Sequence, residues 1–270
     1  MDQYYTNSKL AKELYTEFID LVPYKHRKLL VEPSAGTGAF FRELEGEKLG
    51  FDINPKYPGI FRKDFLRIDI SDYTFIKEIS VLGNPPFGHA GNVAIKFFNH
   101  SAKFAQYIGF ILPKTFKKIS IENRLNLSFF KIYERDCPKN SFIFEGSPYD
   151  VPTIFQIWEK NQNGACRDIV SLEKNQNLVE FICKRKAIEY GENQVLAIRR
   201  VGSKAGQVLK GLDHNENSTY FIRPLAKDAK AILENLDRSM VDYTVAAKSI
   251  SKLEIMLQLG KVKTSENAEI

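Results

Sequence analysis

Short apolar runs that alternate with helix-like segments constrain the fold of this chain more than any other feature. Runs rich in apolar residues and bounded by Gly, Pro or Asp occupy residues 28–33, 48–53, 79–84 and 107–113, with a weaker run at 59–65. Helix-like segments at 39–46 and 91–106 lie between them. Strands that are apolar along their whole length are typical of a sheet covered on both faces, and alternation with helices is typical of parallel pairing. The pattern therefore predicts a mostly parallel α/β sheet.

Three further segments complete this first domain. Residues 8–21 place apolar side chains at helical spacing after Asn7, a good N-cap, and predict an opening helix. Residues 127–134 and 152–160 are strand-like and are joined by a loop without a helix, so we expect an antiparallel pair at one edge of the sheet. The polar segment 161–168 marks a boundary, and residues 1–162 are assigned to this domain.

The remaining residues, 163–270, predict a smaller α+β module. We expect helices at 178–190, near 226–237 and near 248–259, and strands at 194–202 and 218–224. This segment is too short for a second large enzyme domain, so we expect an accessory or substrate-recognition module.

Composition and charge exclude several classes of protein. With 43% hydrophobic and 27% charged residues among 270, the chain can build a globular core. No apolar stretch reaches the roughly 18 residues of a membrane span, and the polar first residues lack the apolar core of a secretion signal, so we expect a cytoplasmic protein without membrane contact. The three cysteines form no C-x-x-C pair, and no metal is expected. The net charge, 39 − 33 = +6, favours a polyanionic partner, and basic residues concentrate at 112–135 and 184–210, although a solvated face is the alternative for either stretch.

A glycine turn follows the first strand of the predicted sheet. The segment VEPSAGTGAF, residues 31–40, passes from an apolar strand through Glu32 to Gly36 and Gly38 at a helix start. Glycines let the backbone approach a ligand closely, and the free N–H groups of a helix start can bind it. The full G-x-G-x-x-G pattern is absent, so a nucleotide-like cofactor fits better than a dinucleotide. A tight turn without a ligand is the alternative.

Acidic residues follow the next two strands. Asp52 stands at a strand end, where a carboxylate can accept the ribose hydroxyls of a bound nucleoside. Asp64 and Phe65 follow the weaker apolar run and can hold an adenine ring by a hydrogen bond and by stacking. Asp69 and Asp72 are alternatives to Asp64.

The segment LGNPPFG, residues 82–88, carries the sharpest chemical signal. Pro85 and Pro86 fix the backbone and contribute no N–H donor, so nearby carbonyls stay available as acceptors. The Asn84 amide oxygen and the Pro85 carbonyl can receive the two hydrogens of an exocyclic amine, while Phe87 stacks on the ring that carries it. A plain turn is the alternative for this segment alone. Its place one strand–helix–strand unit after the glycine turn favours catalysis.

In this order, the segments resemble class I S-adenosylmethionine-dependent methyltransferases that modify exocyclic amino groups, most closely the DNA adenine-N6 methylases with an NPPF or NPPY motif. VEPSAGTGAF resembles the glycine loop of that family, GFDINP its ribose-binding strand end, KDFL the strand that caps the adenine, and VLGNPPFG its catalytic motif. The resemblance begins at Tyr5 and extends to Trp158.

The resemblance implies a Rossmann-like sheet of seven strands with the last one antiparallel, and S-adenosylmethionine as the cofactor. The cofactor-binding residues that it implies are Tyr5, Thr6, Glu32, Pro33, Ser34, Gly36, Gly38, Asp52, Asp64, Phe65 and Asn84. It assigns catalysis to Asn84, Pro85, Pro86 and Phe87, with methyl transfer to N6 of an adenine that has been flipped out of DNA.

The expected partner is nucleic acid, DNA before RNA. An RNA adenine methyltransferase and a non-catalytic binding protein of the same fold are the alternatives. Phe144 is the candidate for the second stacking face on the flipped base, with Tyr149 as its rival. Lys114, Lys117 and Lys118 are the candidates for phosphate contacts.

Overall fold

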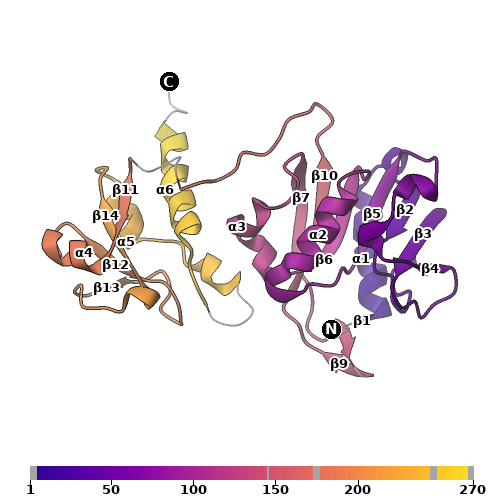
Figure 1. Cartoon of the computed structure of the whole chain (residues 1–270), viewed down its shortest axis with the longest axis horizontal. Coiled ribbons are helices and arrows are strands. Elements are labelled where there is room, and N and C mark those ends of the chain that lie inside the picture. The colour runs from indigo at the N-terminus through magenta and orange to yellow at the C-terminus, as the bar shows by residue number, and fades with distance from the viewer. Residues whose placement is uncertain (1–4, 145, 173–176, 244–247, 267–270) are drawn as a thin grey trace. The chain divides into compact units, whose positions relative to one another are not determined.

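The chain divides into two compact units, and the division does not follow the order of the chain. The computed structural model describes residues 5–144, 146–172, 177–243 and 248–266. The first unit contains Met1–Phe116 and Arg124–Asp168, and the second contains Lys117–Asn123 and Ile169–Ile270 (Figure 1). The sequence did not predict that residues 117–123 belong with the C-terminal part.

A seven-stranded sheet forms the centre of the first unit. Its strands in spatial order are β4 (Ile60–Arg62), β3 (Glu47–Asp52), β2 (Leu29–Glu32), β5 (Ile79–Gly83), β6 (Tyr107–Pro113), β10 (Thr153–Lys160) and β7 (Phe129–Asp136). The pairs from β4 to β6 are parallel, whereas β10 runs antiparallel to both β6 and β7. The sheet is Rossmann-like, and it has the seven strands and the antiparallel last strand that the resemblance implied.

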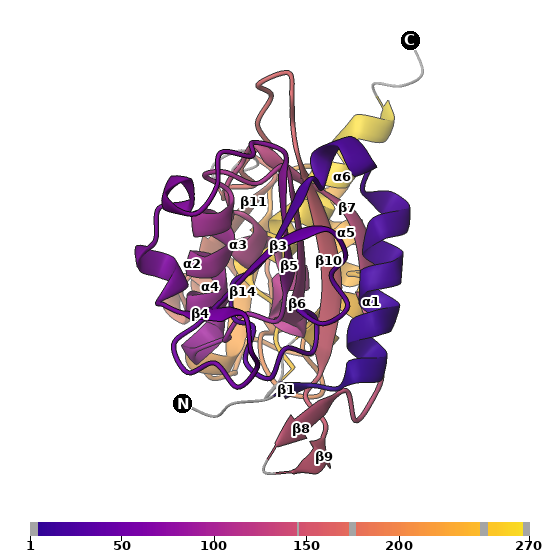
Figure 2. The same cartoon turned by 90° about the vertical axis from the view of Figure 1, so that its right-hand side faces the viewer.

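Helices cover the sheet on both faces. Figure 2 shows α1 (Ser8–Leu21) on one face and α2 (Asn92–Ser101) on the other. Helix α1 begins where the sequence predicts, because the Asn7 side chain accepts a hydrogen bond from the Leu10 N–H at 2.8 Å. Every residue of β2, β5 and β6 is buried, as expected for apolar strands covered on both sides.

A small second sheet lies at the start of the chain. Strand β1 (Tyr5–Thr6) pairs antiparallel with β8 (Phe142–Phe144), which pairs with β9 (Ser147–Tyr149). The sequence predicted only a loop between β7 and β10. Strands β8 and β9 pair with each other within this loop, whereas the other partner of β8, strand β1, lies more than 130 residues away, and no local pattern encodes that partner.

Residues 39–46 do not form the predicted helix. They run in irregular turns after Gly38, with isolated backbone hydrogen bonds such as Leu44 N–H to Phe40 O at 3.1 Å. The Lys48 ammonium donates to the Phe41 and Leu44 carbonyls at 2.8 and 2.7 Å. These carbonyls are thereby satisfied without a continuing helix.

The second unit has an antiparallel sheet with helices. The sheet order is β11 (Val179–Ile182), β14 (Thr219–Pro224), β12 (Leu196–Arg199) and β13 (Val208–Leu209). Its α-helices are α3 (Ile119–Glu122), α4 (Lys184–Tyr190), α5 (Ala229–Glu234) and α6 (Lys252–Glu266). The prediction of one helix over 178–190 is wrong, because the first part of that segment pairs with β14 as a strand.

Short 3₁₀ helices connect several elements of the chain. They are η1 (Tyr24–His26), η2 (Phe65–Arg67), η3 (Ile70–Asp72), η4 (His89–Gly91), η5 (Lys114–Lys117), η7 (Glu216–Ser218) and η8 (Ser239–Tyr243).

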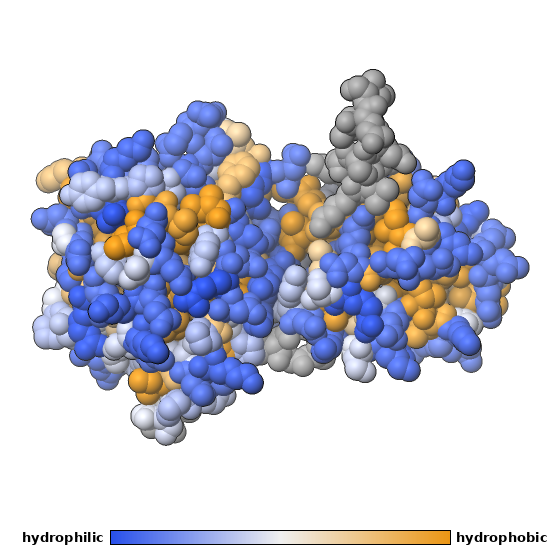
Figure 3. Space-filling view, turned by 180° about the vertical axis from the view of Figure 1, so that it is seen from behind, coloured by the Kyte–Doolittle hydropathy of each residue, from blue (hydrophilic) through white to orange (hydrophobic). Residues whose placement is uncertain are grey.

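Among the described residues, no helix has both the length and the apolar character needed to cross a lipid bilayer. On the face seen in Figure 3, apolar side chains occur in separate groups between hydrophilic ones.

Candidate active site

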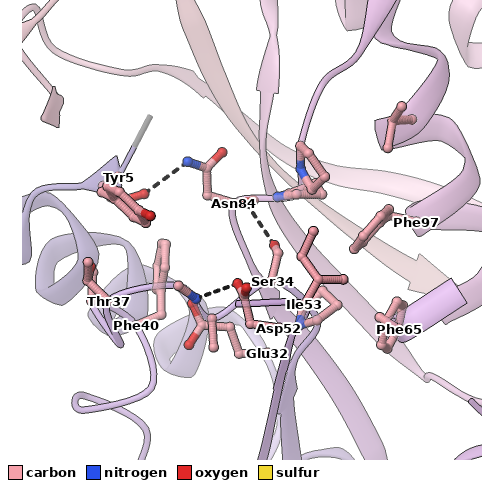
Figure 4. A pocket seen from close by; sticks show the side chains of 18 of the residues that line it. Tyr5, Glu32, Ser34, Thr37, Phe40, Asp52, Ile53, Phe65, Asn84 and Phe97 are labelled. Atoms are coloured by element: carbon pink, nitrogen blue, oxygen red, sulfur yellow. Dashed lines mark hydrogen bonds between the residues drawn. The ribbon is translucent and has the colours of Figure 1, made fainter. Parts of the chain in front are cut away.

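The carboxyl ends of β2, β3 and β5 line one cavity of about 340 Å³. Parallel strands bring their carboxyl ends to the same edge of a sheet, which is where open α/β sheets bind ligands. Strand β2 contributes Glu32, β3 contributes Asp52, and β5 leads into Asn84 (Figure 4). The cavity is large enough for a small-molecule ligand.

The glycine turn after β2 is fixed by the Asp52 carboxylate. Its Oδ2 accepts a hydrogen bond from the Gly36 N–H at 2.7 Å, and its Oδ1 accepts one from the Asn54 N–H at 2.7 Å. Each carboxylate oxygen has two acceptor sites, so both can accept a further donor. Asp52 therefore shapes the turn and can still receive a ligand hydroxyl.

Two positions of this turn require glycine, both for their backbone conformation and because a tyrosine ring lies against each. Gly36 and Gly38 have φ values of +46° and +77°, which disfavour other residues. A Cβ on Gly36 would lie 2.9 Å from the Tyr5 ring, and one on Gly38 would lie 2.7 Å from the Tyr57 ring. Gly36 lines the cavity. Gly38, by contrast, allows Tyr57 to pack against the turn.

Glu32 is a buried carboxylate at the base of the cavity. Only 2% of the residue is exposed, and its Oε2 has no hydrogen-bond partner among the described residues. Burial raises the pKa of Glu32 well above its usual value, against a lowering hydrogen bond from the Phe41 backbone, and the nearby Asp52 charge raises it further. A cationic or hydrogen-bond-donating ligand group is the partner that this oxygen lacks.

The far end of the cavity is aromatic and apolar. Phe65 and Phe97 stack with ring centroids 5.5 Å apart and an interplanar angle of 24°, and Ile53 lines the same end (Figure 4). Asp64 also lines the cavity, but its Oδ1 accepts from the Leu66 N–H at 3.1 Å as the cap of η2. This end suits a flat ring.

Asn84 is held from two sides. Its side-chain Nδ2 donates to Thr6 Oγ1 at 3.1 Å, and its backbone carbonyl accepts from Ser34 Oγ at 2.8 Å (Figure 4). Thr6 and Ser34 line the cavity as well. The two contacts connect the end of β5 with the N-terminal strand and with the glycine turn.

The residues after Asn84 form a loop that is hydrogen-bonded to the start of α2. The Phe87 carbonyl accepts hydrogen bonds from the Val93 and Ala94 N–H groups at 3.1 and 3.4 Å. Gly88 has a φ of +67°, and a Cβ there would lie 2.3 Å from Val93 Cγ2. The loop therefore holds Phe87 at the cavity wall.

The structure brings most of the predicted site residues to this one cavity. Those that line it are Tyr5, Thr6, Glu32, Pro33, Ser34, Gly36, Asp52, Asp64, Phe65, Asn84, Pro85, Pro86 and Phe87. Asp69 and Asp72, the alternatives to Asp64, do not line it within the described part of the chain. Partial burial raises the pKa of Tyr5, and the Asp52 charge adds to this increase.

The predicted substrate contacts lie elsewhere. Lys114 pairs with Asp136 at 2.9 Å, and Lys117 lies over the Tyr243 ring at 5.6 Å. Lys118 is 8% exposed and donates to Ser249, which makes it an internal group rather than the surface cation that the sequence predicted. Phe144 ends β8, but its side chain lies outside the described residues, while its rival Tyr149 is exposed.

Sequence reasoning missed part of the cavity wall. Thr37, Phe40, Ile53, Val93 and Phe97 also line it. The signal for two of them was present, because Val93 and Phe97 are four residues apart and share one face of α2. Their orientation toward the aromatic end of the cavity depends on how α2 packs on the sheet.

Comparison with known proteins gives matches in structure alone. No family model and no curated protein matches the sequence. A putative RNA methyltransferase from Pyrococcus horikoshii aligns at 15% identity and a TM-score of 0.41, over 59% of this chain and 87% of that one. The 23S rRNA methyltransferase ErmE aligns at 14% identity and a TM-score of 0.42, over 59% of this chain and 70% of that one. A putative class I S-adenosylmethionine-dependent methyltransferase from Listeria monocytogenes aligns at 11% identity and a TM-score of 0.43, over 60% of this chain and 61% of that one.

Proposed function

We propose that this protein is an S-adenosylmethionine-dependent methyltransferase that modifies N6 of adenine in nucleic acid, with DNA as the first candidate. One observation carries the proposal. The Asn84–Phe87 loop and the Gly36 turn, 48 residues apart in the chain, line the same cavity at the carboxyl edge of the sheet. The segment proposed to accept the amine and the turn proposed to bind the nucleoside therefore line one cavity, which supports the proposal.

The residues of the cavity fit S-adenosylmethionine. Asp52 has acceptor sites for the ribose hydroxyls, and the Phe65–Phe97 end suits the adenine ring. The buried Glu32 Oε2, which has no described partner, matches the ammonium of the methionine part. When bound, the cofactor supplies a methyl group on a positively charged sulfur.

The Asn84–Phe87 loop provides the chemistry on the substrate side. The Asn84 Oδ1 and the Pro85 carbonyl accept the two hydrogens of the exocyclic amine, which draws the nitrogen toward tetrahedral geometry and makes its lone pair available. Phe87 stacks on the ring that carries the amine. Positioning and polarisation, rather than a strong general base, carry the reaction. The nitrogen would gain the methyl group as the sulfur–methyl bond breaks, leaving a neutral thioether, and the nitrogen would then release one proton to water.

The choice of adenine and of DNA follows the resemblance of the motif set. A base in a duplex cannot reach a cavity at a sheet edge, so the target base must leave its stack. RNA adenine is the main alternative, and the experiment below separates the two.

Methyl transfer from radiolabelled S-adenosylmethionine to separate DNA, RNA and protein pools tests the proposal. Analysis of the labelled nucleosides identifies the modified atom. We expect label in N6-methyladenosine or its deoxy form, and Asn84→Ala to lower transfer at least 100-fold while cofactor affinity stays within about threefold, because the acceptor lost acts on the substrate.

Asp52→Ala is the matched control for this variant. It removes the ribose acceptor and the support of the glycine turn, so we expect it to weaken cofactor binding strongly in isothermal titration. Label in RNA alone would replace DNA by RNA as the substrate. Cofactor binding without transfer to any pool would identify a binding protein of the same fold, and a fully active Asn84→Ala would remove the catalytic role of the loop.

A further inference from the structure

The N-terminal strand β1 is held by β8 along its length and by the start of α1 after it. Tyr5 and Thr6 pair with Ile143 and Phe142 of β8. Immediately after them, the Asn7 N–H donates to the Ser141 carbonyl at 3.0 Å. The Asn7 side chain also caps α1. The position of Thr6 is therefore set by the hairpin on one side and by the first helix on the other.

Thr6 contacts the loop that the proposed function makes catalytic. It is 6% exposed, and its Oγ1 accepts a hydrogen bond from Asn84 Nδ2 at 3.1 Å. In Figure 4 this hydrogen bond is the dashed line that begins at the Asn84 amide nitrogen, and the amide oxygen of Asn84 points away from it. The contact joins residues that are 78 positions apart in the sequence.

The orientation of this amide decides which group meets the substrate. An amide carries a donor at one end and an acceptor at the other. A substrate amine is also a donor. If the Asn84 side-chain amide were flipped, its NH2 group would therefore face the NH2 group of the substrate, and no hydrogen bond could form between them. A fixed partner for Nδ2 keeps Oδ1 as the group that meets the amine, and it removes rotation that the reaction would otherwise have to restrict.

The backbone of Asn84 is held independently. Ser34 donates to its carbonyl at 2.8 Å, so the path of the loop does not depend on Thr6. Loss of the Thr6 hydroxyl would release the amide plane while the loop keeps its place. This separation makes the role of Thr6 testable on its own.

We propose that Thr6 is a positioning residue, which holds the Asn84 amide with its oxygen presented to the amino group of the substrate, and that strand β8 fixes Thr6 for this task. The proposal rests on the proposed function and extends it. It differs from the role in cofactor binding that the sequence resemblance implied for Thr6.

Two variants separate these roles. Thr6→Val keeps the shape of the side chain and its preference for a strand but removes the acceptor. Thr6→Ser keeps the hydroxyl. We expect Thr6→Val to lower kcat 10- to 100-fold with the dissociation constant of S-adenosylmethionine changed less than threefold, and Thr6→Ser to restore kcat to within about threefold of the wild type.

A third measurement tests whether Thr6 acts through Asn84. In the Asn84→Ala background, adding Thr6→Val is expected to change the remaining rate less than twofold, because the partner is already absent. Ser34→Ala is the control for a general loosening of the loop, and its rate loss is expected to remain additive with that of Thr6→Val.

The possible failures are distinguishable. An active wild type with a Thr6→Val variant of equal kcat overturns the positioning role and leaves the proposed function intact. Weaker cofactor binding by Thr6→Val with unchanged kcat overturns it in favour of a cofactor contact. A wild type that methylates no pool overturns the proposed function and the role of Thr6 together. Cofactor titration with each variant verifies that the first unit is folded, and Thr6→Ala replaces Thr6→Val if the latter does not fold.

Discussion

Two buried carboxylates, one in each unit, differ in the charge that lies beside them. Glu32 of the first unit is 2% exposed, and its Oε2 has no hydrogen-bond partner among the described residues. Glu254 of the second unit is 1% exposed, and its Oε1 likewise has no hydrogen-bond partner there but lies 3.7 Å from the Lys118 ammonium. Its Oε2 also accepts from the Ser251 N–H at 2.7 Å, and its own N–H donates to Ser251 Oγ at 3.2 Å, which together form a capping box at the start of α6.

The difference separates a structural group from a binding group. A buried charge needs a partner, because removal from water costs several kcal/mol that only a close opposite charge and hydrogen bonds offset. Glu254 finds its partners within its own unit. Glu32 instead faces the cavity, and the partner expected for it is the ligand.

Among the variants that test this comparison, we expect removal of the Lys118 charge to have the largest effect, and it acts on the free energy of unfolding. Lys118→Met leaves Glu254 buried without its cation, and we expect the free energy of unfolding to fall by about 3–5 kcal/mol. Urea unfolding followed by circular dichroism measures the loss. The single Trp of the chain, Trp158, lies in the first unit, so its fluorescence reports that unit separately.

Lys114→Met is the matched control for Lys118. It removes a partly exposed pair with Asp136, so the expected cost is below about 1 kcal/mol. Equal effects of the two variants would mean that the burial of Lys118 and Glu254 is unimportant for stability.

Glu32→Gln tests the other side of the comparison. In the ligand-free protein, folded Glu32 keeps its proton above the usual carboxyl pKa of 4.5, whereas the unfolded chain releases it. The free energy of unfolding should therefore fall as the pH rises through the window above 4.5 toward the raised folded pKa. Glu32→Gln should flatten this dependence, and urea unfolding at a series of pH values measures it.

The same variant should weaken cofactor binding. Loss of a charged acceptor for the ammonium corresponds to about 1.5–3 kcal/mol, or roughly 10- to 100-fold in the dissociation constant by isothermal titration. Glu45→Gln, which changes an exposed carboxylate in the segment after the glycine turn, is expected to alter neither quantity. Unchanged affinity in Glu32→Gln would end the assignment of Glu32 to the cofactor.

The smallest effect is expected at the basic residues of α4, of which Arg185 and Lys186 are exposed and Lys184 is partly exposed. Lys184 pairs with Asp213 at 2.6 Å and Arg185 with Glu189 at 3.7 Å, and the pairing lowers the pKa of Asp213. These pairs are exposed on at least one side, so a phosphate can replace the carboxylates at little cost. Substitution of Lys184, Arg185 and Lys186 by Ala should lower nucleic-acid affinity and reduce the salt slope by up to about 0.9 per phosphate contact.

A titration of labelled oligonucleotide at several salt concentrations measures that slope. The control removes two other exposed lysines of the second unit, Lys227 and Lys230. Slopes that are identical in wild type and in the α4 variant would assign α4 to ordinary surface.

Local sequence signals predicted the elements whose cause is local. The Asn7 cap, the buried strands and the residues at the strand ends were all readable, because side-chain periodicity and capping act over a few residues. The helix predicted over 178–190 failed where β11 pairs with β14, since the pairing partner lies some forty residues away. The helix predicted over residues 39–46 does not form, and the Phe41 and Leu44 carbonyls there accept hydrogen bonds from the distant end of the Lys48 side chain instead.

The sequence by itself determined which chemical groups follow the strands of this protein. They are a glycine turn after the first apolar run, a carboxylate after the second, and an amide followed by two prolines after a later one. Only the tertiary structure decided that Thr6 meets Asn84, that Lys118 is internal, and that Glu32 has no described partner for its Oε2. The physical reason is that hydrogen bonds and ion pairs require atoms within a few ångströms. Chain folding creates that proximity between residues that are far apart in sequence, and no local pattern records it.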